Sequence, residues 1–377
     1  AIAQHQRRRF VSPAQGEMIE RPDRGLLGKA HGSFRLQGWE TGGLVSVVYH
    51  DDLKEVQGDA ALTALLTAPQ ARAPFDRSEW WQGLADHCDI QPLIAVARDG
   101  EHRAVLPLMR QQRRLHALKV WYTFRVVPLF TPGADRQKLI DALAEGLIGE
   151  APHLVLEPMA DEDGLATALA AGLRRAGWVT FMSSCDVNHV LNLGGRSFSE
   201  YLATRPGPLR TTLKRKAGKV AVELTTRFDP ALWDEYEAVY AASWKPEEGC
   251  PDFLRAFAEQ EAAAGRLRMA VARADGRAVA AQFWTVEGGT AFIHKLAHTI
   301  DSKSLSPRTT LSAALFEQVI DRDRVSLIDF GTGDDGYKRD WMEQVRPRYR
   351  VEAFRPLCAG NWPLIAKAAL RPMLQHG

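Results

Sequence analysis

Side chains able to do acid–base chemistry gather in residues 325–341, VSLIDFGTGDDGYKRDW. The apolar run at 325–330 predicts a short buried strand, and the glycines that follow bend the chain into a loop. This loop presents Asp334, Asp335, Tyr337 and Lys338. Carboxylates can take a proton from a substrate and a phenol can return one, so the loop is a candidate site on a rigid support. The alternative is an ordinary glycine and aspartate turn.

A second group of polar residues precedes this strand. Three strands are expected in a meander, at 267–273, 278–287 and 290–298. His298 ends the last strand, and a loop then leads into a helix predicted at 309–322. Free N–H groups and the dipole of a helix N-terminus favour an anion. Ser306, Arg308, Thr309 and Thr310 would surround a phosphate there, as in coenzyme A or a nucleotide. The alternative is that Ser306 or Thr309 only caps the helix.

Two further sets of residues carry charge or aromatic surface. Trp244 and Lys245 follow a predicted helix, where a tryptophan can pack on the core and a cation suits the helix dipole. Arg210 and Lys214 lie one turn apart on a basic helix that contains no acid. Such a face is either solvated or a surface for an anionic substrate, cofactor phosphates or RNA. Nucleophile–histidine triads, dinucleotide fingerprints, phosphate-binding Walker loops and zinc-protease motifs do not occur.

Length and composition restrict the class of protein. A chain of 377 residues, with 45% hydrophobic and 25% charged residues, suits two globular domains. Its net charge of +2 argues against a general DNA-binding protein. No apolar run has the length of a membrane span or of a signal peptide. The four cysteines are far apart in the sequence, so we expect no metal site, no disulfide framework and a cytoplasmic location.

Periodicity and turn residues predict the remaining elements. Further strands are expected at 44–49, 93–98, 103–109, 119–129, 153–157, 178–183, 189–193, 222–228 and 348–355. Further helices are expected at 60–66, 78–88, 135–149, 162–176, 198–204, 208–220, 230–243, 251–264 and 362–374, with Ser78 as a cap and a basic connection at 110–116.

An internal repeat indicates a duplicated domain. The sequence AVARDG at 95–100 opens a hairpin after a helix, and AVARADG at 270–276 does the same. We therefore interpret the chain as two copies of one α/β domain, with a boundary at 185–197. The expected divisions are a partly disordered tail, a first module, a second module and a terminal strand end with a helix, at 1–43, 44–190, 191–350 and 351–377.

Residues 197–341 resemble the GNAT-like acetyltransferase domain of CelD-type proteins, which are related to the FemAB aminoacyltransferases. The motifs that carry the resemblance are PLRTTLKRKAGKV (208–220), SWK (243–245), the meander at 265–298, LSPRTTL (305–311) and DFGTGDDGYKRDW (329–341). The first half of the chain fits more loosely, through PFDRSEWW (74–81) and the repeated hairpin.

The resemblance implies an acyl-CoA-dependent N-acyltransferase built from two tandem GNAT-like modules, each a mixed, mostly antiparallel sheet flanked by helices. The acyl-CoA would lie between strands 290–298 and 325–330, with its diphosphate at the helix that follows Arg308, where the family usually has glycine. Ser306, Thr309 and Thr310 would complete the cofactor site.

In the mechanism that this implies, Tyr337 would act as acid, and Asp334, Asp335 or His298 as base. The substrate would meet the following side chains: Lys338, Trp244, Lys245, Arg210 and Lys214. The acceptor would be a small-molecule amine, such as an amino sugar or an envelope polysaccharide precursor. Two alternatives stay open: a FemAB-type transferase that uses aminoacyl-tRNA, and a non-catalytic scaffold in polysaccharide assembly.

Overall fold

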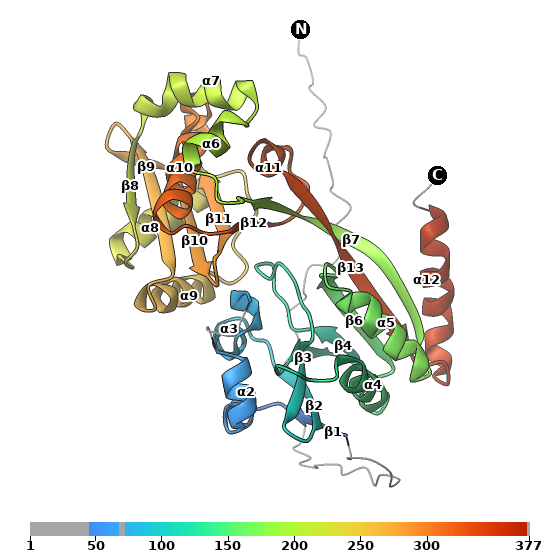
Figure 1. Ribbon diagram of the computed structural model, residues 1–377. Coiled ribbons are helices and arrows are strands. Elements are labelled where there is room, and N and C mark those ends of the chain that lie inside the picture. Colours follow the sequence, from blue (N-terminus) through green and yellow to red (C-terminus); the bar gives the residue numbers. More distant parts are fainter. Residues whose placement is uncertain (1–44, 68–71, 375–377) are drawn as a thin grey trace. The chain divides into compact units, whose positions relative to one another are not determined.

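The computed structural model describes residues 45–67 and 72–374, with side chains to residue 370. The tail predicted at 1–43 lies outside the described residues. A mixed sheet of 13 strands organises the described part of the chain (Figure 1). Its strands are β1 (Ser46–His50), β2 (Pro92–Asp99), β3 (His102–Gln111), β4 (Arg114–Ala117), β5 (Leu129–Phe130), β6 (His153–Met159), β7 (Val179–Asn192), β8 (Ala221–Thr225), β9 (Leu267–Ala274), β10 (Arg277–Glu287), β11 (Thr290–His298), β12 (Leu327–Thr332) and β13 (Gln344–Phe354).

Helices flank this sheet. They are α1 (Leu53–Gln57), α2 (Ala60–Leu65), α3 (Ser78–His87), α4 (Arg136–Leu147), α5 (Leu165–Arg175), α6 (Phe198–Ala203), α7 (Gly207–Lys216), α8 (Pro230–Ala241), α9 (Pro251–Ala263), α10 (Pro307–Glu317), α11 (Gly336–Trp341) and α12 (Trp362–Leu374). A π-helical turn at Gln318–Arg322 extends α10. Within the described residues, no helix combines the length and the apolar content that crossing a bilayer requires.

The sheet contains the same arrangement twice. Its strands run in the order β1-β2-β3-β4-β6-β13-β7-β12-β11-β10-β9-β8, and β5 pairs with β3. In each half an antiparallel series ends in one parallel pair, β4 with β6 and β11 with β12. A helix connects the two strands of each parallel pair, α4 in the first half and α10 in the second. The duplication predicted from the repeated hairpin is therefore confirmed. We call the halves the N-terminal module and the C-terminal module.

Two long strands join the modules. The sequence predicts separate strands at 178–183 and 189–193, but β7 is continuous over 14 residues. Its polar middle lacks an apolar pattern, yet its backbone pairs with β13, which keeps the strand extended. The end of β7 pairs with β12, whereas β13 also pairs with β6 (Figure 1). The last strand of the chain thus returns to the sheet of the N-terminal module, and the boundary predicted at 185–197 begins within β7.

Three large clusters of apolar side chains stabilise the sheet. One lies beneath α4 and α5, and another lies beneath α10. The third is shared by the modules, because Trp80 of α3 meets Phe253 and Phe257 of α9. Each buried aromatic side chain contributes about 1.5–3 kcal/mol through loss of exposed apolar surface. The two modules therefore share one hydrophobic core.

Several local predictions are wrong. The segment predicted as a strand at 119–129 is irregular up to β5, with one bridge from Val126 to Met159. Tyr122 and Phe124 pack into the shared core instead of following a strand alternation, whereas Trp121 is exposed. The basic connection at 110–116 contains β4, and residues 336–341 form α11 instead of a loop. Ser78 is the first residue of α3 and forms no capping bond, since Arg77 holds the cap position.

Candidate functional site

The central feature of the C-terminal module is an opening between β11 and β12. These parallel strands pair only over Thr290–Phe292 and Leu327–Asp329. Beyond this point β11 continues along β10, while β12 continues along β7. The pairing of β10 with β11 also slips by one residue at His294, which forms a bulge where the strands part. Backbone groups of β11 that would pair with β12 in a closed sheet therefore face the opening.

A cavity of about 630 Å³ lies at the open end of these strands. Side chains reach it from the end of β11, the start of α10, the start of α11 and the segment after α8. Its lining residues are Trp244, Lys245, His298, Ile300, Lys303, Ser306, Pro307, Arg308, Thr309, Asp335 and Tyr337. Eight residues predicted from the sequence are thus brought together: Trp244, Lys245, His298, Ser306, Arg308, Thr309, Asp335 and Tyr337.

The N-terminus of α10 points polar groups at this cavity without a side-chain cap. Ser306 adopts a left-handed conformation with φ of 54°, and its carbonyl accepts the N–H groups of Thr309 and Thr310 at 3.1 and 3.4 Å. Its hydroxyl accepts a hydrogen bond at 3.2 Å from Lys216 of α7, whose ammonium also donates to a neighbouring carbonyl. Ser306 therefore does not cap the helix with its side chain, and the helix start carries extra positive charge. Thr310 is buried and does not line the cavity.

Arg308 brings a cation into the cavity without a salt bridge to any described carboxylate. Its guanidinium carbon lies 4.3 Å from the ring centroid of Tyr337, and within the described residues it forms no ion pair. Burial lowers the pKa of the Arg308 guanidinium. A half-buried cation that lacks a carboxylate partner is stabilised by an anionic ligand, and a guanidinium suits the oxygens of a phosphate.

Two groups in the cavity have protonation states set by burial. Burial, with the nearby Asp335, raises the pKa of Tyr337 to about 12, so the phenol keeps its proton at neutral pH. Burial, with Arg308 and Lys303 close by, lowers the pKa of His298 to about 4, so its imidazole is neutral. The His298 ring lies 4.4 Å from the ring of Trp244. The cavity therefore holds a proton donor, a neutral proton acceptor and the carboxyl of Asp335.

An ion-pair cluster that the sequence did not reveal lies behind the cavity. The ammonium of Lys295 on β11 donates to Glu248 at 2.7 Å, and the hydroxyl of Tyr122 donates to the same carboxylate at 2.7 Å. Tyr122 comes from the N-terminal module. Phe124 also reaches across, because a Cβ placed on Gly331 would lie 2.8 Å from its ring. Gly331, with φ of 68°, lets this ring approach the end of β12.

The remaining predicted residues lie outside the cavity. The carboxylate of Asp334 accepts hydrogen bonds from His189 at 3.1 Å and Arg339 at 3.2 Å. Lys338 is buried, and its ammonium donates to the carbonyl of Thr332. Burial lowers the pKa of Lys338. Arg210 and Lys214 are exposed on α7. Their proposed roles stay predictions.

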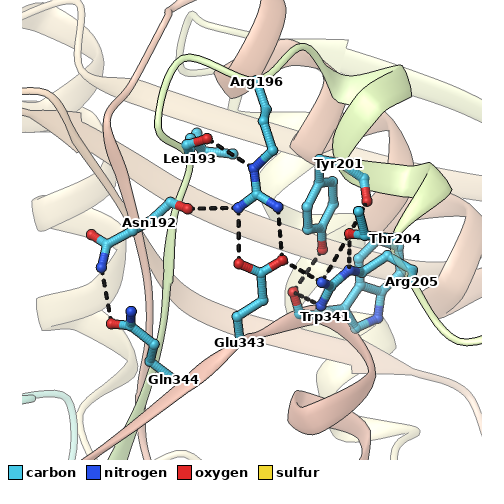
Figure 2. Close-up of polar contacts among 9 residues, drawn as sticks. All are labelled: Asn192, Leu193, Arg196, Tyr201, Thr204, Arg205, Trp341, Glu343 and Gln344. Atoms are coloured by element: carbon cyan, nitrogen blue, oxygen red, sulfur yellow. Dashed lines mark hydrogen bonds and ion pairs between the residues drawn. The ribbon is translucent and has the colours of Figure 1, made fainter.

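A polar network fixes the end of α11, and through it Tyr337. The Trp341 carbonyl accepts a hydrogen bond from the Tyr201 hydroxyl at 2.7 Å (Figure 2). Shortly after Trp341, the carboxylate of Glu343 accepts hydrogen bonds from Arg196 at 2.9 and 2.8 Å. It also accepts a hydrogen bond from Arg205 (Figure 2). Arg205 lies between α6 and α7. Its partner lies more than a hundred residues away, so no local signal indicated the pair.

Comparison with known families places the cavity in a recognised domain. Residues 209–339 match the acetyltransferase (GNAT) domain family, and this stretch contains every residue that lines the cavity. The C-terminal module thus contains a segment that matches a GNAT acetyltransferase domain, as the motifs predicted. A specific likeness to CelD-type proteins stays a prediction. Within the described residues, no group of three or more His, Cys, Asp or Glu side chains is arranged to hold a metal ion.

Solved structures share the fold over 82–85% of this chain. FemX matches with a TM-score of 0.55 and 11% identity, over 85% of this chain and 99% of that one. The C-terminal domain (DUF2156) of a putative lysylphosphatidylglycerol synthetase from Agrobacterium fabrum matches with 0.53 and 16%, over 85% and 95%. A tandem GNAT protein from the clavulanic acid biosynthesis pathway matches with 0.50 and 14%, over 82% and 98%. No curated protein matches the sequence. At these identities the likeness shows the tandem GNAT fold.

Proposed function

We propose that the C-terminal module transfers an acyl group from acyl-CoA to the amine of an acceptor. The observation that carries this proposal is the cavity at the β11–β12 opening, where Arg308, Tyr337 and His298 meet inside a GNAT domain. The cavity joins an anion site to a proton donor and a proton acceptor. Those are the groups that transfer from a nucleotide-bearing thioester requires.

The residues present suit the phosphates of coenzyme A. Arg308, Lys303 and the Thr309 hydroxyl line the cavity at the start of α10, and Lys216 lies beside Ser306. Glycine at position 308 would allow close approach of the backbone to a phosphate, whereas arginine supplies a cation and donors from its side chain. With arginine in place of the family's glycine, the side chain instead of the backbone would bind the phosphate.

The chemistry assigned to these side chains is proton transfer. His298 or Asp335 would take the proton that the acceptor amine loses, directly or through water. Tyr337, whose phenol stays protonated, would give a proton to the departing thiolate. Backbone N–H groups of β11 that face the opening would polarise the thioester carbonyl. The acceptor would be a small amine, including an amino sugar or an envelope polysaccharide precursor, and Trp244 with Lys245 would line its approach.

The second candidate is transfer from aminoacyl-tRNA. The observation in its favour is the exposed basic face of α7, where Arg210 and Lys214 have no acid on the same helix. Such a face attracts nucleic-acid phosphates and also the phosphates of coenzyme A. A non-catalytic scaffold, in contrast, predicts a closed opening between β11 and β12, so the cavity of about 630 Å³ favours an enzyme.

Ligand binding tests the proposal directly. Thermal unfolding of the full chain is followed with acetyl-CoA, longer acyl-CoAs, coenzyme A and ATP as a nucleotide control. A ligand at about a hundred times its Kd should stabilise the protein by about 2.7 kcal/mol. Release of free thiol is then measured with a panel of amines. Lack of stabilisation by every acyl-CoA would overturn the proposal. Transfer that occurs only with charged tRNA and stops after RNase treatment would establish the second candidate.

A further inference from the structure

Lysines near the cavity differ in what their amino groups contact. Lys295 forms an ion pair at 2.7 Å, and Lys338 donates to a backbone carbonyl. Lys216 donates to the carbonyl of Ser304 at 2.9 Å. Lys245 also lines the cavity, but its amino group forms no hydrogen bond or ion pair within the described residues. It is therefore free to react with a ligand in the cavity.

The position of Lys245 places its amine at the open end of the strands. The charges that act on it come from Lys295 on β11, from Glu248, and from Asp335 and Lys338 at the start of α11. β11 and α11, which follows β12, lie on opposite sides of the opening. The nitrogen also lies 5.9 Å from the ring centroid of Tyr240, which gives it an apolar wall. Lys245 thus stands where an acceptor amine would enter to meet a thioester held between β11 and β12.

We propose that Lys245 is a self-acylation site, which takes the acyl group from bound acyl-CoA when no acceptor amine is present. This inference rests on the proposed function. The lone pair of the neutral amine attacks the thioester carbonyl carbon, a C–N bond forms and the C–S bond breaks. Coenzyme A leaves as a thiolate and takes up the proton that the nitrogen loses. The products are an Nε-acyl-lysine and the free thiol, with no other reactant.

The amine must be uncharged to attack, and its surroundings favour that form. Burial, with the charge of Lys295, lowers the pKa of Lys245 to about 8. Compared with an ordinary lysine, this raises the neutral fraction near pH 8 on the order of a hundredfold. The rate of acylation should therefore rise with pH up to about 8 and level off above it. The amide product carries no charge and fills the acceptor side of the cavity, so we expect it to slow transfer to other amines.

Lys303 is a matched control within the same protein. It lines the same cavity but is exposed, and it stands on the side of the α10 N-terminus. The full chain is incubated with acetyl-CoA alone, and acetylated lysines are mapped by peptide mass spectrometry across a pH series. The expected result is one acetyl group on Lys245, formed at least about tenfold faster than on Lys303. Excess free coenzyme A and the Arg308→Ala variant should both suppress it.

The outcomes separate this inference from the proposed function. Acyl-CoA binding in the thermal experiment without an adduct on Lys245 overturns the inference and leaves the proposed function intact. Equal adducts on Lys245, Lys303 and surface lysines, unaffected by excess coenzyme A, show reaction in solution and also overturn it. Failure of binding and of adduct formation together overturns both. A Lys245→Arg variant, which keeps a cation, should lose the adduct and keep thermal stabilisation by acyl-CoA.

Discussion

The two modules begin equivalent helices in opposite ways. In the N-terminal module, Asp135 caps α4, and its carboxylate accepts the N–H of Lys138 at 3.1 Å. In the C-terminal module, α10 begins after Ser306, whose side chain makes no cap, and Arg308 adds a cation. The start of α4 thus carries its own carboxylate cap, whereas no side chain caps the start of α10. Only the second leaves the helix dipole free for a ligand.

The regions beyond the two parallel strand pairs also differ, because in the described part of the chain only the one in the C-terminal module is open. Beyond the pairing of β4 with β6, the N–H of Val126 donates to the carbonyl of Pro158 at 2.8 Å, and Lys119 forms an ion pair with Glu157 at 2.8 Å. The segment that contains Lys119 and Val126 therefore lies along the edge of β6. Beyond the pairing of β11 with β12, no bridge among the described residues rejoins the strands, and the cavity lies there. The same connectivity therefore gives a structural module and a module with a site.

The N-terminal module nonetheless packs against the elements that form that site. The segment after β4 supplies Tyr122, which bonds the partner of Lys295, and Phe124, which packs on Gly331. The comparison shows that the fold alone does not make a site. An unpaired cation and parted strands are needed as well.

The largest effect should come from removing the proton donor. Tyr337→Phe should lower kcat about a hundredfold, because general acid catalysis contributes at least that much. Tyr49→Phe in the N-terminal module is the control, since that hydroxyl is also buried and the residue lies on β1, far along the sheet from β12. Rates are measured as thiol release with an amine found in the acceptor screen. Equal rates for the two variants would remove Tyr337 from the mechanism.

The unpaired arginine should govern affinity. Arg308→Ala should raise the Kd for acyl-CoA about 10- to 100-fold, because a charge-assisted contact contributes about 1.5–3 kcal/mol. Arg136→Ala is its counterpart at the start of α4, where the guanidinium lies 5.7 Å from the ring of Phe130, and should leave the Kd unchanged. Calorimetric titration measures both. An equal loss in the two variants would mean that the modules share ligand binding.

Transferring the carboxylate cap between modules tests the comparison itself. Ser306→Asp should weaken acyl-CoA binding about tenfold, because the new carboxylate would pair with Lys216 and occupy the helix N-terminus. Aspartate tolerates the left-handed backbone at this position, so folding should be preserved. Ser306→Asn, of the same size but neutral, should bind nearly as the wild type does. Matching affinities for the Asp and Asn variants would argue against a phosphate at this helix.

The smallest effect concerns stability alone. Asp135→Ala should lower the free energy of unfolding by about 1 kcal/mol, since it removes the cap of α4. Ser306→Ala should cost less, because that side chain caps nothing. Urea denaturation measures both, and acyl-CoA binding to Asp135→Ala should match wild type. A larger loss for Ser306→Ala would show that α10 depends on its hydroxyl.

Much of the fold could be predicted because its signals are local. The meander, the helix starts at Pro230 and Pro251, and the repeated hairpin follow from periodicity, turn residues and proline at the first helical turn. The same signals indicated most of the cavity residues, because residues 298–309 and 335–337 lie at the end of β11 or in short segments that follow β11 and β12. The prediction of a strand at 119–129 was wrong because the buried aromatic residues of this segment pack against the other module. The local sequence pattern does not show such a contact.

The sequence by itself predicted two copies of one α/β domain and an anion-favouring helix start, because the repeated hairpin and the helix N-terminus depend on residues near in the chain. Only the tertiary structure decided which predicted groups share the cavity. It bonded Asp334 to His189 and buried Lys338, and among the described residues it gave the side chains of Arg308 and Lys245 no ion-pair partner. The physical reason is that burial and pairing depend on strands that meet across long loops, as β13 does when it returns to β6. Local periodicity carries no record of such pairings.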